Sequence, residues 1–162
     1  MPGLPLHDLL LDWGSFYSNH AAVRTAVSFV HVAALVAAGG AAITADRGIL
    51  SALRLDEHAR RVQVSAIQKT HRVVAAGLAL ITLSGLLLLA ADLDTYLYSR
   101  VFWIKMGLVG LLLVNGMVLI AAERRAAQGT ATAWSTLRLT ALASIALWLL
   151  TTLGGVALPN IG

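Results

Sequence analysis

Ionisable residues are rare inside the apolar stretches of this sequence, and His31 lies deepest among them. It stands near the middle of the apolar run from Thr25 to Ala45. An ionisable side chain at membrane depth is energetically costly, so its presence is a hypothesis of function. On a helical wheel, His20, Arg24, Ser28 and His31 share one face of the helix that this run predicts. This face therefore carries a polar stripe that ends at His31.

Two polar residues of a later apolar run fall at depths on either side of His31. Lys105 stands at the start of that run, and Asn115 lies about 15 Å further along a helix. Helices that alternate in direction place His31 between these two depths. We therefore expect His31, Arg24, Lys105 and Asn115 to face one cavity between the helices.

Such a cavity suits haem b. A histidine imidazole can ligate the iron, and arginine or lysine side chains pair with the propionates. We therefore expect haem b as cofactor, bound by His31, Arg24, Lys105 and Asn115. In the alternative interpretation His31 hydrogen-bonds a neighbouring helix, for example at Asn115, while Arg24 and Lys105 extend to the membrane surface.

Three histidines are candidate metal ligands: His31, His20 and His71. His20 lies on the same helix face as His31 but about 16 Å away, and His71 is expected about 15 Å away along the membrane normal. Neither is expected to share an iron with His31, and His71 is expected at the inner interface or in a second site. Met106 and Met117 carry thioethers that can ligate iron, although a methionine on an apolar face usually serves packing.

The elements that position these residues are four apolar runs. The chain has 162 residues, of which 58% are hydrophobic and 12% charged, whereas soluble domains carry about 25% charged residues. Each run is long enough to cross a bilayer and is continuous rather than alternating, which indicates helices. We predict an all-α, integral membrane four-helix up-down bundle in one domain, residues 1–162, with spans at about 21–45, 67–91, 101–122 and 135–158. No carboxylate lies within these spans, so a carboxylate proton relay is not expected.

Residues 4–18 are predicted to form a short N-terminal interfacial helix, with Trp13 and Tyr17 at the membrane surface. Nine of the 12 Lys and Arg residues fall near two of the connections, after the first and the third span. The positive-inside rule then places both connections in the cytoplasm and both termini outside, in a bacterial-type inner membrane. Expected partners are the lipid bilayer and a larger membrane complex or a second copy of the chain. Nucleic acid is not an expected partner.

Two segments resemble a known family. Phe29-Val30-His31-Val32, followed by Gly39-Gly40 and Arg47, resembles the first helix of HemJ-type protoporphyrinogen oxidases and the related CopD-like membrane proteins. Phe102-Trp103-Ile104-Lys105 resembles the third helix of the CopD-like relatives. The resemblance implies a haem-associated four-helix membrane protein, with His31 and Lys105 at the matching positions. Val114-Asn115 stands where HemJ-type proteins carry a tyrosine–histidine pair, which argues against protoporphyrinogen oxidation.

These observations leave four functions open. The leading one is a haem-b-binding or redox-associated membrane protein. The others are a HemJ-type protoporphyrinogen oxidase, a copper-handling membrane protein, and a non-catalytic small subunit of a respiratory or photosynthetic complex. Three methionines and no cysteine are a weak signature for copper, which favours clustered soft ligands.

Overall fold

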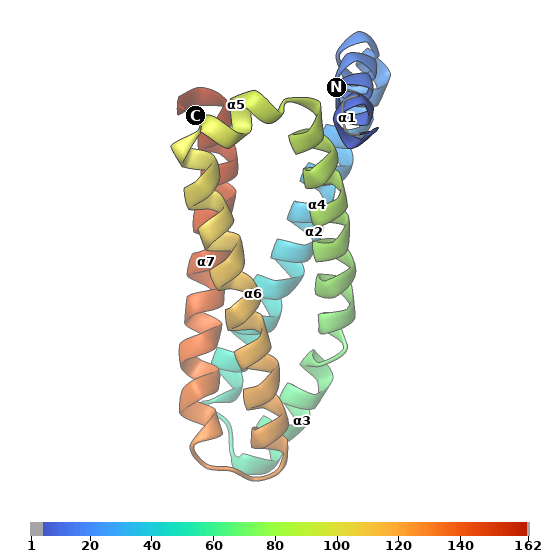
Figure 1. Cartoon of the computed structure of the whole chain (residues 1–162). Helices are drawn as coiled ribbons and strands as arrows, with labels where there is room; N and C mark the ends of the chain where they lie inside the picture. The colour runs from blue at the N-terminus through green and yellow to red at the C-terminus, as the bar shows by residue number, and fades with distance from the viewer. Residues whose placement is uncertain (1–4, 162) are drawn as a thin grey trace.

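The structure is a computed structural model that describes residues 5–161, and this part of the chain is built from α-helices. The helices are α1 (Pro5–Asn19), α2 (Ala21–Ala52), α3 (Glu57–Ile67), α4 (Thr70–Ala91), α5 (Leu93–Tyr98), α6 (Arg100–Ala127) and α7 (Ala133–Ile161). Of these, α2, α4, α6 and α7 are the long ones and run up and down in alternation (Figure 1). The predicted all-α four-helix fold with a short N-terminal helix is therefore confirmed.

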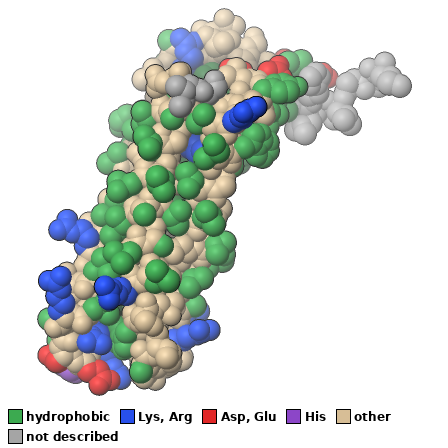
Figure 2. Space-filling view, turned by 90° about the vertical axis from the view of Figure 1, so that its left-hand side faces the viewer, with side chains coloured by type: hydrophobic (Ala, Val, Ile, Leu, Met, Phe, Trp, Pro, Cys, Tyr) green, Lys and Arg blue, Asp and Glu red, His purple; other side chains and the backbone are tan. Residues whose placement is uncertain are grey.

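The two ends of the bundle differ in what they carry. The N-terminus, the C-terminus, α1 and α5 lie at one end, here called the terminal end (Figure 1). The other end, here called the basic end, carries α3 and the connection from α6 to α7. Figure 2 shows hydrophobic side chains over the visible face, with Lys and Arg side chains more numerous toward the basic end. This distribution matches an apolar belt that ends in basic loops.

Short polar side chains start several of the helices. The Asp56 carboxylate accepts a hydrogen bond from the Ala59 backbone N–H at 3.0 Å and so caps the start of α3. Ser99 does the same for α6 by accepting from the Phe102 N–H at 3.2 Å. These caps satisfy backbone donors that the first turn of a helix leaves unpaired. Gly129, with a φ of 85°, makes the turn between α6 and α7.

The helices extend beyond the apolar runs that predict them. The first span is predicted to end at residue 45, yet α2 continues to Ala52, and α6 continues beyond residue 122 to Ala127. Asp46 and Glu123 therefore lie inside helices and are buried there. A hydropathy pattern ends at the first charged residue, whereas a helix ends only where its backbone hydrogen bonds end.

Small residues set how closely the helices approach one another. A Cβ on Gly77 of α4 would lie 2.5 Å from the Ala38 Cβ of α2, so the two backbones meet directly at this point. A Cβ on Gly39 would lie 3.1 Å from the ring of Trp148 in α7. Close approach at small residues is the usual way in which membrane helices pack.

The helices pack in two pairs rather than as a closed square. α6 packs along α7, and α2 packs along α4 and also contacts α7. In contrast, α4 and α6 lie apart toward the terminal end, where α5 bridges the distance between them (Figure 1). The space between α4 and α6 is where the candidate site is found.

Candidate functional site

A cavity of about 220 Å³ lies between α2, α4, α6 and α7 in the half of the bundle nearer the terminal end. Its walls are mostly apolar and include Leu35, Leu78, Ile81, Leu112 and Trp148. A few polar side chains join them: His31, Thr82, Tyr96, Lys105 and Thr151. An apolar cavity with a small number of polar groups is the usual form of a small-molecule site.

The cavity opens sideways between α4 and α6. Leu86 of α4 and Leu113 of α6 both line it, and they are 56% and 46% exposed. Side chains that belong to a cavity and also face outward mark its rim. Because this rim lies in the apolar belt of the bundle, the opening faces the hydrocarbon of the bilayer rather than water.

His31 is held by a hydrogen bond to the neighbouring helix. Its Nδ1 lies 2.9 Å from Ser84 Oγ of α4. Ser84 Oγ donates its single proton to the Leu80 carbonyl at 2.6 Å, so it accepts from His31. This direction favours the tautomer of a neutral imidazole that carries its proton on Nδ1 and a lone pair on Nε2. The alternative interpretation, a hydrogen bond from His31 to a neighbouring helix, is therefore confirmed, but with Ser84 as the partner. Asn115, the example given for it, instead donates from Nδ2 to the Thr140 carbonyl of α7 at 2.9 Å.

Lys105 carries the positive charge of the cavity. Its side chain lies along α7 beside two glycines, with Nζ 3.6 Å from the position that a Cβ on Gly155 would occupy. No carboxylate forms an ion pair with it in the part of the chain that the structure describes. A half-buried ammonium without an anionic partner is suited to bind an acidic or strongly polar group of a ligand.

Two polar residues of the predicted stripe lie outside the cavity. Arg24 donates hydrogen bonds to the Ser18 carbonyl and, at 3.5 Å, to the Tyr17 carbonyl, and so caps the C-terminal end of α1. His20 is exposed, and its Nδ1 lies 2.8 Å from the Phe16 carbonyl. The structure therefore brings His31 and Lys105 together, but it does not place Arg24, His20 or Asn115 with them.

Three further residues add polar or soft groups to the cavity, and of these the sequence singles out only Met106, as a thioether that can ligate iron. Met106 follows Lys105 and lines the same cavity. Thr151 is buried, and its hydroxyl has no hydrogen-bond partner among the described residues. Burial raises the pKa of the Tyr96 phenol above its ordinary value, as do the charges of Asp92 and Tyr17. Tyr96 therefore presents a neutral hydroxyl at the terminal end of the cavity.

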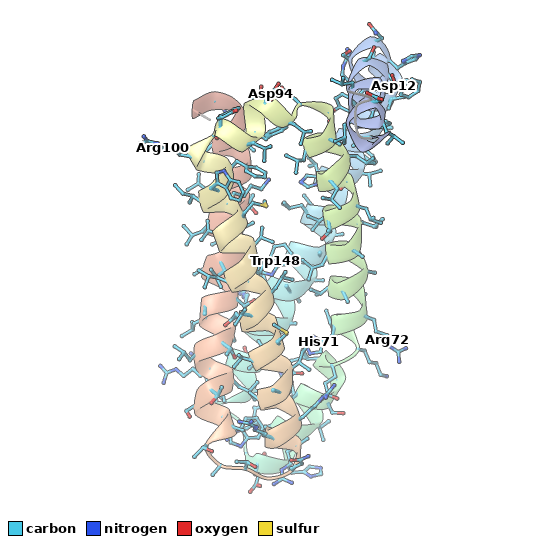
Figure 3. The ribbon with its side chains drawn as sticks, in the orientation of Figure 1. Asp12, His71, Arg72, Asp94, Arg100 and Trp148 are labelled. Carbon is cyan, nitrogen blue, oxygen red and sulfur yellow. The ribbon has the colours of Figure 1, made fainter. Side chains whose placement is uncertain are left out.

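His71 belongs to a second polar cluster, nearer the basic end. Its Nε2 lies 2.6 Å from Glu123 Oε2 of α6, and Asp46 of α2 is close enough to interact with both. Figure 3 shows His71 directed toward the inside of the bundle and Arg72 directed away from it. The expectation that no carboxylate lies inside the spanning helices is therefore wrong, because α2 and α6 continue past their apolar runs.

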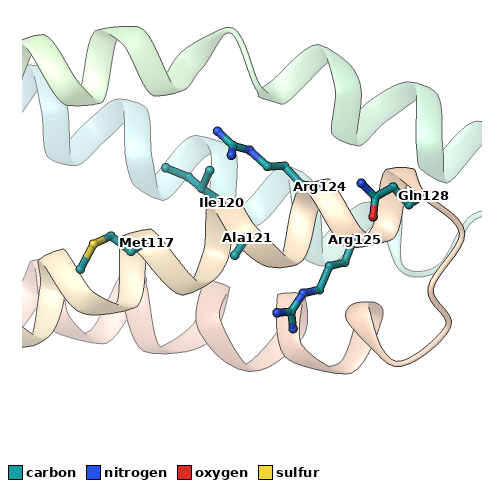
Figure 4. Close-up of a pocket in the computed structure, with 6 residues that line it drawn as sticks. All are labelled: Met117, Ile120, Ala121, Arg124, Arg125 and Gln128. Atoms are coloured by element: carbon teal, nitrogen blue, oxygen red, sulfur yellow. The ribbon is translucent and has the colours of Figure 1, made fainter.

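A larger groove lies on the outer surface of α6 near the basic end. It measures about 370 Å³ and is lined by Met117, Ile120, Ala121, Arg124, Arg125 and Gln128 (Figure 4). All of these residues come from one helix, and Figure 4 shows Arg124 and Arg125 diverging to either side of it. The groove is therefore an open helix face with apolar and then basic residues, which suits lipid chains and headgroups.

Four helical segments are long and apolar enough to cross a membrane: Ala21–Ala52, Glu57–Ala91, Arg100–Ala127 and Ala133–Asn160. The second of these consists of α3 followed by α4. The fold and its apolar surface define the chain as a multi-pass α-helical membrane protein. The sequence matches a family of unknown function, DUF6644, over residues 13–158, and the protein belongs to that family. Neither the curated proteins nor the solved structures gave a match.

Proposed function

We propose that this protein binds haem b, or a related redox cofactor, in the cavity between α4 and α6. The observation that carries the proposal is the state of His31. Its Nδ1 is held by Ser84 and its Nε2 keeps a lone pair, in a cavity that is otherwise largely apolar. Ligating histidines commonly have the second ring nitrogen oriented in this way by a hydrogen bond.

Met106 is the candidate for a second iron ligand. It lines the same cavity as His31 but from α6. A thioether opposite an imidazole is an established haem ligand set, and it raises the reduction potential. Met117, the next methionine along α6, lines the outer groove instead and is 63% exposed. The two methionines therefore provide a matched test pair.

Lys105 would interact with the propionates of a bound haem. Its ammonium is unpaired within the described chain and borders the cavity, so it can form a charge-assisted bond to a carboxylate. Arg24, which the sequence suggests for the same role, is engaged with the end of α1. The site thus offers one cation rather than two.

The size of the cavity restricts how haem would be held. Its volume of about 220 Å³ is below the range of about 300–1,000 Å³ that is usual for ligand sites. The sideways opening between α4 and α6 adds space on the lipid side. The residues at this opening, Leu86 and Leu113, would therefore have to contact any haem that the cavity holds.

An absorption spectrum of the purified protein from a haem-replete host tests the proposal. We expect a Soret band that His31→Ala abolishes. Met106→Leu should retain haem but lower its reduction potential, because a thioether ligand is lost. Met117→Leu is the matched control and should leave the spectrum and the potential unchanged. A colourless native protein, or a Soret band unaffected by His31→Ala, would refute haem binding at this site.

A quinone is the second candidate ligand, and the small volume of the cavity favours it. A single quinone ring needs less space than a porphyrin, and its isoprenoid tail can lie in the opening. Lys105 and the unpartnered Thr151 hydroxyl could hydrogen-bond its carbonyl oxygens. In a haem-free preparation, a lipid-soluble quinone should quench the fluorescence of the protein, in which Trp148 lines the cavity. Lys105→Met should weaken the quenching.

The other functions gain less support. A copper site requires clustered ligands, and no group of three or more His, Cys, Asp or Glu residues in the described chain is arranged to hold a metal ion. The resemblance to CopD-like and HemJ-type proteins is proposed on the two short segments that contain His31 and Lys105. Both termini lie at one end of the bundle (Figure 1), so they share one side of the membrane, and the basic residues of the opposite end support our proposal that this side is the outer one.

A further inference from the structure

We infer that Asp46, His71 and Glu123 form a proton-binding centre in the basic half of the bundle, separate from the cavity around His31. Three different helices supply the three residues: α2, α4 and α6. The ligand is a proton, which one of the two carboxylates binds beside the imidazole. This site is independent of whether the cavity near the terminal end binds haem.

The first argument is burial. Glu123 is 1% exposed and Asp46 is 3% exposed. Taking an ionised carboxylate out of water costs several kcal/mol unless other groups compensate it. The core contains two clusters of buried apolar side chains, one that includes Ala42 and one that includes Ile49. Asp46 lies between these two residues along α2. Its surroundings therefore supply little compensation beyond the cluster itself.

The second argument is the state of the carboxylate oxygens. Glu123 Oε2 is paired with His71 Nε2 at 2.6 Å. Two other oxygens, Asp46 Oδ2 and Glu123 Oε1, are buried and have no partner among the described residues. Buried polar atoms are normally satisfied, so two orphaned carboxylate oxygens in one cluster call for a ligand.

The third argument is charge. His71 is the only cation that pairs with either carboxylate in the described chain. Arg60 and Arg61, on the nearby helix α3, are engaged elsewhere: Arg60 donates to the Leu53 and Leu55 carbonyls, and Arg61 pairs with Glu57. The residues that follow the cluster members in sequence, Arg47, Arg72 and Arg124, are exposed.

Two carboxylates therefore face one imidazole. Even with the imidazole charged, two ionised carboxylates would leave one uncompensated negative charge between apolar clusters. One further proton, on Asp46 or Glu123, removes that charge. Groups coupled this closely hold their protons as a set rather than one by one.

A metal ion does not meet the same need. No group of His, Cys, Asp and Glu in the described chain has the arrangement that a metal requires. A proton needs only one oxygen atom and a neighbouring acceptor. The geometry thus favours a proton over a coordinated cation.

His71 connects the buried carboxylates with the exterior. Its side chain is 25% exposed, whereas that of Glu123 is 1% exposed. A proton taken from water onto Nδ1 makes the imidazole cationic, and transfer of the Nε2 proton to Glu123 Oε2 restores a neutral ring. The imidazole gains one proton and passes one on, so it acts as the exchange step of the centre.

Infrared spectroscopy of the native protein in lipid nanodiscs tests this inference. We expect the C=O band of a protonated carboxylic acid near neutral pH, which shifts in D₂O and disappears as the pH is raised. Asp46→Asn and Glu123→Gln should each abolish or displace this band. Asp94→Asn, an exposed carboxylate on α5, is the control and should leave it unchanged.

Several results would overturn the inference. Absence of this band from the native protein at neutral pH would overturn it, and this measurement does not depend on whether a variant folds. A band that survives in both Asp46→Asn and Glu123→Gln would belong to another carboxyl group. Loss of the band on adding sodium chloride at constant pH would assign the site to a metal cation instead of a proton.

Discussion

At the scale of single residues, the state of His31 depends on a serine one helix away. Ser84 accepts from Nδ1 and in turn donates to the Leu80 carbonyl, so a backbone group of α4 sets the tautomer of a ring on α2. A histidine in an apolar stretch is visible in the sequence. Its partner is not, because serines are common in membrane helices and many of them bond only their own backbone.

Replacing Ser84 tests this arrangement. Ser84→Ala removes the bond to His31 and should lower stability by about 1 kcal/mol, the usual net value of one hydrogen bond. It should also let the Nδ1 and Nε2 tautomers of His31 mix, which NMR of ¹⁵N-labelled histidine measures. Thr44→Ala is the matched control, because the Thr44 hydroxyl bonds only the Gly40 carbonyl of its own helix. An unchanged tautomer in Ser84→Ala would contradict the assignment.

The sequence predicts the positions of some site residues but not of others. Depth alone groups Lys105 with Asn115, yet ten residues along a helix rotate the side-chain direction by about 280°, which leaves the two side chains about 80° apart. This angle was available in the sequence and predicts that Asn115 faces another helix. Arg24 differs, since its engagement with α1 depends on how two consecutive helices meet at His20, which no periodicity shows.

At the scale of helices, the lengths of the elements decide which residues are buried. Apolar runs predict the four long helices and the approximate location of each. They do not predict that α2 and α6 continue as helices and carry Asp46 and Glu123 into the packed interior. A carboxylate after an apolar run is usually solvated, and only the position of α3, α4 and α7 around these residues removes them from water.

The contact between α2 and α4 gives an element-scale prediction. Gly77→Ala would place a Cβ 2.5 Å from that of Ala38, so the helices must separate, at an expected cost of about 1–3 kcal/mol. Gly110→Ala on α6 is the control, because a Cβ there meets nothing within 4 Å. Thermal unfolding in detergent, followed by circular dichroism, should show a lower midpoint for Gly77→Ala only. Equal midpoints would contradict the close approach of α2 and α4 at Gly77 and Ala38.

At the scale of the whole molecule, the distribution of charge predicts which way the bundle faces. The chain contains no cysteine, so single-cysteine variants report on one site each. Tyr98→Cys, at the terminal end and 87% exposed in the native chain, should react with a membrane-impermeant maleimide on intact cells. Gln128→Cys, at the basic end, should react only after the membrane is opened. The reverse pattern would contradict the proposed orientation, with termini outside.

Because the cavity opens between α4 and α6, the concentration of a ligand in the bilayer is the one that determines binding. A molecule that enters through the apolar belt comes from the bilayer, so its mole fraction in lipid, rather than its amount per volume of water, sets the occupancy of the site. Apparent affinities measured in different amounts of lipid or detergent would differ even if the protein were unchanged. Titrations of this protein are therefore comparable only at a fixed ratio of ligand to lipid.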